Sequence, residues 1–185
     1  MKLSSIASIN SGVYSSTISK GEVFYIQARD FDENRQIVDN LTPALSYREN
    51  LEKHFLQQGD ILMVAKGASF LAAVYDGFYT PAVASTVFLV IHINNKQQVD
   101  PQFVSWFLNQ SSTQSYLLTL SRGTSTPSIN KKILKDLEIP VPQIMKQDLI
   151  LKIAELRKNE MLLRRKIEEL KENKLNQLIS NAINN

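Results

Sequence analysis

Short apolar runs separated by turn residues dominate the first 145 residues of the chain, and this pattern predicts β-strands. The runs are Val23–Gln27, Ile61–Ala65, Phe70–Tyr75 and Val83–Ile93. The second run begins directly after Gly59-Asp60, a pair that favours a turn. Because apolar side chains occupy both sides of the fourth run, we expect this longest strand to be covered on both faces and central to its sheet.

Helical patterns follow these strands. Asp100 is a good N-cap and precedes a proline, which suits the first position of a helix. We expect this helix to run to about Leu108 and helical structure to resume through Tyr116–Leu118. The segment Lys131–Leu137 predicts one or two further turns, and Ile139-Pro140 predicts a short strand after them.

A different pattern begins at Lys146 and continues to Ser180, where apolar positions alternate spacings of four and three. This spacing predicts a coiled-coil helix about 50 Å long at ~1.5 Å per residue. The apolar seam consists of Leu149, Ile153, Leu156, Leu163, Ile167 and Leu170. Glu160 and Lys174 interrupt it with polar side chains. Because the seam is narrow and the helix is long, we expect the seam to pack against a partner helix.

These patterns predict an α/β (α+β) domain over residues 1–145, with a mixed, twisted sheet and short helices, followed by one long C-terminal coiled-coil helix over residues 146–185. If the helix serves only for pairing, truncation at Pro142 is expected to leave a folded monomer.

Six short motifs follow one another along the chain, and their order is informative. They are Gly59-Asp60-Ile61-Leu62, Gly123-Thr124, Ser128-Ile129, Leu134, Ile139-Pro140-Val141-Pro142 and Gln147. In this order they resemble the strand, loop, turn, short helix, second strand and helix start of a target recognition domain. Such domains belong to the specificity (S) subunits of Type I restriction-modification systems. The resemblance covers nearly the whole chain.

The resemblance implies a non-catalytic subunit that recognises double-stranded DNA for methyltransferase (M) and restriction (R) partner subunits. Full-length members carry two recognition domains and two spacer helices, whereas this chain has one of each. The resemblance therefore implies a half-length S subunit that forms a homodimer through its C-terminal helix and recognises a bipartite, palindromic site. S-adenosylmethionine and ATP are expected only on the partner subunits, and no cofactor is expected on this chain.

Composition is that of an ordinary globular protein, with 43% hydrophobic and 21% charged residues. The chain has no cysteine, which favours a reducing compartment. No stretch reaches signal-peptide or membrane-spanning length, so we expect a cytoplasmic protein without a membrane partner. The formal net charge of +3 lies entirely in residues 146–185, because residues 1–145 carry 12 basic and 12 acidic residues. Charge alone therefore does not indicate nucleic-acid binding.

The sequence contains no complete motif for catalysis or metal binding. His54 and His92 are the only histidines and have no metal-ligand spacing, so no metal site is expected. Ser128 and Lys131 match an acyl-transfer pattern whose companion motifs are missing. Asp60 is expected to serve as a turn or cap residue. Neither a glycine-rich phosphate loop nor an adenine methyltransferase motif occurs in the sequence.

Candidate DNA-binding residues are basic and hydroxyl side chains in predicted loops, where they can donate to phosphates or base edges. They are Arg29, Arg48, Lys66, Ser69, Arg122, Gly123, Thr124, Thr126 and Lys131. A plain connecting loop is an equally good interpretation of the segment that begins at Arg122. Tyr14, Tyr75 and Tyr79 are expected in the core or at its rim.

Three other interpretations remain open at this stage. The first is a fragment from a shuffled or phase-variable locus. The second is a stand-alone DNA-binding regulator with a borrowed recognition domain, and the third is a coiled-coil interaction module without DNA binding. The neutral charge of residues 1–145 favours the last of these. Salt dependence separates it from DNA binding, because phosphate contacts weaken steeply as salt rises.

Overall fold

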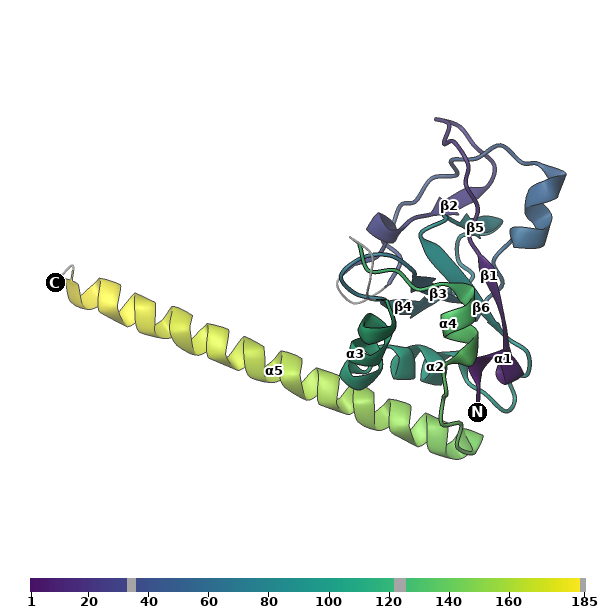
Figure 1. The fold of residues 1–185 in the computed structure, drawn as a ribbon. Helices are drawn as coiled ribbons and strands as arrows, with labels where there is room; N and C mark the ends of the chain where they lie inside the picture. The colour runs from purple at the N-terminus through teal and green to yellow at the C-terminus, as the bar shows by residue number, and fades with distance from the viewer. Residues whose placement is uncertain (33–35, 122–125, 184–185) are drawn as a thin grey trace. The chain divides into compact units, whose positions relative to one another are not determined.

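The computed structural model describes residues 1–32, 36–121 and 126–183 (Figure 1). The strands are β1 (Ala7–Ser11), β2 (Phe24–Ile26), β3 (Ile61–Val64), β4 (Ala72–Val74), β5 (Ala82–Ala84) and β6 (Phe88–Ile93). The α-helices are α1 (Leu3–Ile6), α2 (Pro101–Leu108), α3 (Ser111–Leu120), α4 (Lys131–Asp136) and α5 (Ile144–Ile183). Two 3-10 helices, η1 (Ala28–Asp30) and η2 (Glu49–His54), lie between β2 and β3 in the chain.

The strands form two sheets. Four of them build an antiparallel sheet in the order β1-β6-β3-β4, in which Ile91 of β6 faces Ile9 on one side and Ile61 on the other. The strands β2 and β5 pair in parallel, with Phe24 opposite Ala82. As expected from its apolar pattern, β6 is an interior strand of its sheet.

The run Val83–Ile93 is not one strand, and this prediction was wrong. It divides into β5 and β6, which belong to different sheets. A turn joins them, in which the Phe88 amide donates to the Ser85 carbonyl at 3.0 Å. Ser85 and Thr86 are the polar signal of that turn, but apolar residues on both sides make the run look continuous.

Two other segments also differ from the predicted pattern. Ile139-Pro140 forms no strand, although the Ile139 amide donates to the Met1 carbonyl at 2.8 Å and Glu138 forms an isolated bridge with Lys2. Pro140 lacks the N–H that would extend this pairing. The N-terminal elements α1 and β1 were not predicted, because polar residues break their apolar pattern.

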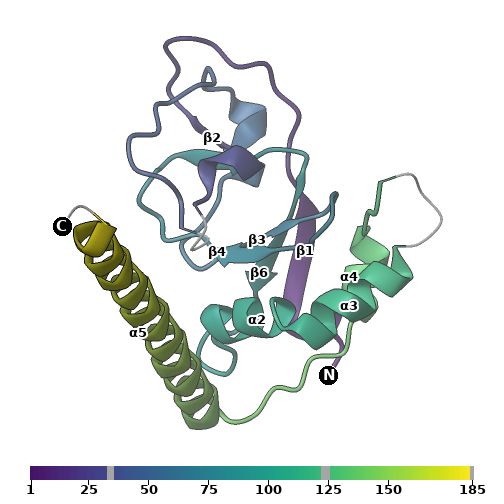
Figure 2. The same ribbon diagram turned by 90° about the vertical axis from the view of Figure 1, so that its left-hand side faces the viewer.

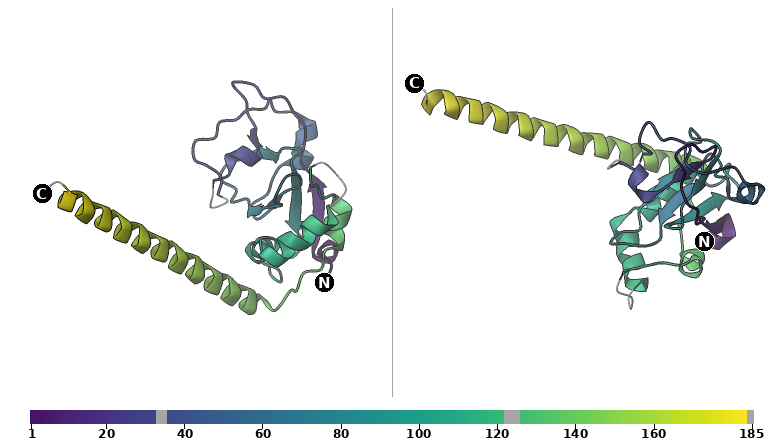
Figure 3. Two further views of the ribbon diagram at one scale, coloured as in Figure 1. Left: turned by 60° about the vertical axis from the view of Figure 1, so that its left-hand side comes forward. Right: turned by 90° about the horizontal axis from the view of Figure 1, so that it is seen from above.

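Both faces of the larger sheet are covered over part of their area. On one face, a cluster formed by Leu62, Tyr75, Ala84 and Phe88 joins the two sheets with Ile26. On the other side, α2 packs on β4 and α4 packs on β1. Figure 1 shows the β2-β5 pair at one end of the domain and α2 and α3 at the other, and Figure 2 and the left view of Figure 3 show the same domain turned about the vertical axis.

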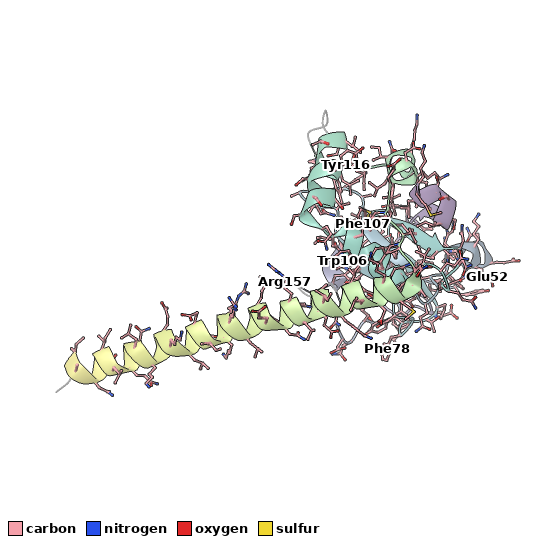
Figure 4. All side chains as sticks on the ribbon, turned by 90° about the horizontal axis from the view of Figure 1, so that it is seen from below. Glu52, Phe78, Trp106, Phe107, Tyr116 and Arg157 are labelled. Atoms are coloured by element: carbon pink, nitrogen blue, oxygen red, sulfur yellow. The ribbon has the colours of Figure 1, made fainter. Side chains whose placement is uncertain are left out.

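Residues Met1–Gln147 form one compact unit and residues Asp148–Asn185 form another. Within α5, side chains such as Arg157 project from the helix surface (Figure 4). The helix begins at Ile144, two residues before the predicted start. The fold class is confirmed: a mixed α/β domain is followed by a single long C-terminal helix.

Candidate nucleic-acid interface

Two of the predicted recognition segments lie side by side. The loop after β3 pairs with the segment before α4 through a bridge between Lys66 and Ser128. The Gly67 amide donates to the Pro127 carbonyl at 3.0 Å, and the Ile129 amide donates to the Ala65 carbonyl at 2.9 Å. These bonds hold together two loops that are about 60 residues apart in the chain.

The candidate side chains in these loops are exposed. Lys66 and Ser69 lie in the β3–β4 connection, and Thr126 lies on the paired segment. Arg122, Gly123 and Thr124 lie outside the described residues. The structure therefore brings three of the predicted residues into one loop pair.

Arg29 belongs to the same part of the domain. It lies in η1, and its guanidinium is 3.8 Å from the Asp30 carboxylate. Two nearby residues, Ala28 and Phe31, line a cavity together with Val64 and Leu71 next to the β3–β4 connection. Arg29 itself is mostly exposed and can reach outward from this position.

Arg48 and Lys131 begin other elements. Arg48 is exposed and precedes η2, whose Leu51 packs in a second small core. Lys131 starts α4 directly after Asn130, whose side chain accepts a hydrogen bond from the Ile133 amide at 3.0 Å. Lys131 directly follows the loop pair in the chain, whereas Arg48 lies in a different segment, before η2.

Sequence reasoning missed a polar cavity beside β1. Its lining includes Ser8 and Asn10 of β1, Lys53, His54, Asp60 and His92, and its volume is about 140 Å³. Burial first, and then the charges of Lys53 and Lys131, hold the pKa of His54 below its usual range. Lys131 therefore lies within electrostatic reach of this cavity. No spacing in the sequence signals it, because its residues come from four separate segments.

Asp60 is the one acidic residue of this cavity's described lining, and both of its oxygens are engaged. One oxygen lies 2.8 Å from Nδ1 of His92, and the other accepts the Gln57 amide at 2.8 Å. Asp60 thus closes the turn before β3, the role expected from its place after Gly59, and it also orients the His92 ring.

The tyrosines divide between the core and the surface. Tyr75 and Tyr79 are buried, and burial raises the pKa of Tyr75 to about 12. Tyr14 is 85% exposed, which differs from the core or rim position expected for it.

Among the described residues, no group of three His, Cys, Asp or Glu side chains is arranged to hold a metal ion. In the same part of the chain, no helix is both long and apolar enough to cross a membrane.

The described residues thus combine a compact α/β domain, which has basic and hydroxyl side chains on paired loops, with a long helix that has an exposed apolar seam. The chain belongs to the family of Type I restriction modification DNA specificity domains, which it matches over residues 1–172. This match includes the α/β domain and most of α5.

Two solved structures share the fold. The S subunit of a Type I restriction-modification system from M. genitalium aligns with a TM-score of 0.55 at 16% identity, over 84% of this chain and 37% of that one. A structure concerned with complex assembly and conformational transition of the type I R-M system aligns with a TM-score of 0.59 at 17% identity, over 89% of this chain and 43% of that one. This chain thus spans about two fifths of each. No curated protein matched it significantly.

Proposed function

We propose that this chain is the sequence-specific DNA recognition subunit of a Type I restriction-modification complex and acts as a homodimer on a bipartite site. It directs adenine methylation and restriction that M and R partner subunits carry out. The family match over residues 1–172 carries this proposal. In this arrangement S-adenosylmethionine and ATP bind the partner subunits, and this chain performs no catalysis.

The apolar seam of α5 supports the homodimer. Its six side chains, from Leu149 to Leu170, are between 51% and 69% exposed in the single chain. Along the seam, leucines alternate with Ile153, Glu160 and Ile167, and isoleucine at one seam position with leucine at the other favours pairs of helices. Burial of such side chains stabilises association by roughly 25 cal/mol per Å² of apolar surface.

The coverage of the solved structures supports the homodimer. The chain aligns with 37% and 43% of the two larger chains. One recognition domain and one helix per protomer become two of each in a dimer. A two-fold dimer presents identical loops to two half-sites, so the recognised DNA sequence is expected to be palindromic.

The test is a mass measurement by light scattering of the purified chain, first alone and then with its cognate methyltransferase subunit. We expect a dimer that takes up two methyltransferase subunits. A monomer that ignores the methyltransferase contradicts both the dimer and the palindromic site, and indicates a fragment or a borrowed recognition domain.

DNA binding is tested separately with a library of random duplexes. We expect enrichment of a bipartite palindrome, with affinity that falls steeply as salt rises. Enrichment of DNA without methyltransferase uptake indicates a stand-alone regulator. Dimerisation that salt leaves unchanged, together with no DNA enrichment, indicates a protein-interaction module.

A further inference from the structure

The polar cavity beside β1 combines cationic side chains with small hydrogen-bond donors. Ser8 and Asn10 occupy alternate positions of β1, opposite His92 and Val90 of β6, so they share one face of the sheet. Lys53 and His54 close the cavity from the end of η2. A hydroxyl, an amide, an ammonium and imidazole rings are all groups that donate hydrogen bonds to anionic oxygens.

The charge balance of the cavity favours an anion. Lys53 lines it, and Lys131 lies near enough to lower the pKa of His54. Asp60 contributes the opposing charge, but its oxygens already accept from Gln57 and contact His92. Nδ1 of His92 lies against Asp60, so Nε2 is the nitrogen of this ring that can bond a ligand, and it donates to an anion only in the imidazolium form. Within the lining Lys53 offsets the charge of Asp60, and Lys131, whose charge reaches His54, adds a positive charge outside the lining.

We propose that this cavity binds a phosphate group, and that in the assembled protein this group is a backbone phosphate of DNA. The DNA source rests on the function proposed above, whereas phosphate binding as such does not. A volume of about 140 Å³ is several times the roughly 30 Å³ share of one water molecule and accommodates a tetrahedral oxyanion. A phosphate held there positions the domain on the duplex without reading sequence.

The position of the cavity agrees with this assignment. Lys131, whose charge lowers the pKa of His54, lies three residues after Ser128, and Ser128 pairs with Lys66 in the exposed loop pair. The cavity and the candidate recognition loops are thus connected through residues 128–131. A backbone contact next to loops that contact bases sets their register on the duplex.

The first test uses inorganic phosphate and the two histidine side chains as NMR probes. Their ring resonances are assigned with His54→Gln and followed while phosphate replaces chloride at constant ionic strength. We expect saturable shifts of both ring resonances and an increase in the pKa of His54, because a bound anion stabilises the imidazolium. Shifts no larger than those in chloride overturn the phosphate site.

The second test measures affinity for a mixed-sequence duplex at several salt concentrations, with Lys53→Ala/Lys131→Ala compared with wild type. The matched control is Lys135→Ala, an exposed lysine on α4 outside the cavity lining. Loss of one phosphate contact is expected to reduce the slope of log K against log salt by about 0.9. The control is expected to keep the wild-type slope.

The two tests separate the proposals. Histidine shifts with an unchanged slope in the double variant show that the cavity takes free phosphate and overturn the DNA assignment. If wild type binds the duplex but phosphate moves neither histidine, the cavity proposal fails and DNA recognition stands. If wild type does not bind any duplex, the proposed function fails, and the NMR result alone decides the phosphate site.

Discussion

Gln147 is the polar side chain that ties the start of α5 to the domain. It is completely buried, and its Oε1 accepts the Asp100 amide at 2.9 Å. Its Nε2 donates to the carbonyls of Gln98 and Pro142 at 2.8 and 2.7 Å. Glutamine suits this position because one primary amide satisfies a donor and two acceptors of the backbone at once.

Replacement of Gln147 by alanine is expected to lower the free energy of unfolding of the domain by about 2–4 kcal/mol, because it leaves three backbone groups without partners. Denaturant unfolding followed by circular dichroism measures this loss. Gln143→Ala, an exposed glutamine one turn earlier, is the control and is expected to change stability by less than about 0.5 kcal/mol. Equal effects of the two variants contradict the role of the buried amide.

At the scale of elements, two side-chain amides cover the edge of the larger sheet. The outer edge of β4 would otherwise expose its backbone groups, because β4 is the last strand in the order. Asn109 accepts the Ala72 amide at 3.0 Å and donates to the Ala72 carbonyl at 2.7 Å. Gln114 bonds both backbone groups of Phe70 at 2.9 Å. These two amides act as a substitute strand and block pairing with another chain.

The double variant Asn109→Ala/Gln114→Ala is expected to lose stability and to aggregate, because it leaves the Phe70 amide and carbonyl and the Ala72 amide without these partners, while the Ser105 hydroxyl still donates to the Ala72 carbonyl. Light scattering on mild heating measures the aggregation. Gln110→Ala, whose side chain donates a hydrogen bond to the Trp106 carbonyl of α2 and none to Phe70 or Ala72, is the comparison and is expected to stay soluble. A double variant that scatters no more than Gln110→Ala contradicts the protective role.

At the scale of the whole molecule, the two units have different sources of stability. The domain of residues 1–147 has its own buried core. Along Asp148–Ile183 every seam side chain is exposed, and local support comes from ion pairs such as Asp148–Lys152 and Glu160–Arg164, each at 2.7–2.8 Å. Exposed pairs of this kind stabilise a helix only weakly, so a partner helix is the expected source of further stability.

The variant Leu156→Asp/Leu163→Asp is expected to convert the proposed dimer into a monomer, because it places charges in the apolar seam. Light scattering at several protein concentrations measures the mass. Met161→Asp, an equally exposed apolar position off the seam, is expected to remain dimeric. Monomers in both variants, or dimers in both, contradict the assignment of the seam.

Truncation locates the boundary between the units. The structure includes Gln147 in the compact domain, so a chain ending at Gln147 is expected to be a folded monomer. A chain ending at Pro142 loses the three hydrogen bonds of Gln147 and is expected to unfold at lower denaturant concentration. Comparison of the two unfolding midpoints measures the contribution of residues 143–147.

Local patterns predicted those elements whose stability depends on neighbours in the chain. The Asp100 cap and following proline predicted α2, where the Asp100 carboxylate accepts the Gln102 amide at 2.7 Å. The four-three spacing predicted the long helix α5. The ordered motifs predicted the family, because they mark positions where a turn, a cap or a buried amide is needed.

By itself, the sequence determined the α/β class, the long C-terminal helix, its apolar seam and the family, since periodicity and motif order are properties of neighbouring residues. Only the tertiary structure decided that Val83–Ile93 divides between two sheets, that Lys66 pairs with Ser128, and that Lys53, His54 and His92 surround one polar cavity. The physical reason is distance along the chain. Strand pairing and cavities join residues tens of positions apart, and no local pattern records which of them meet.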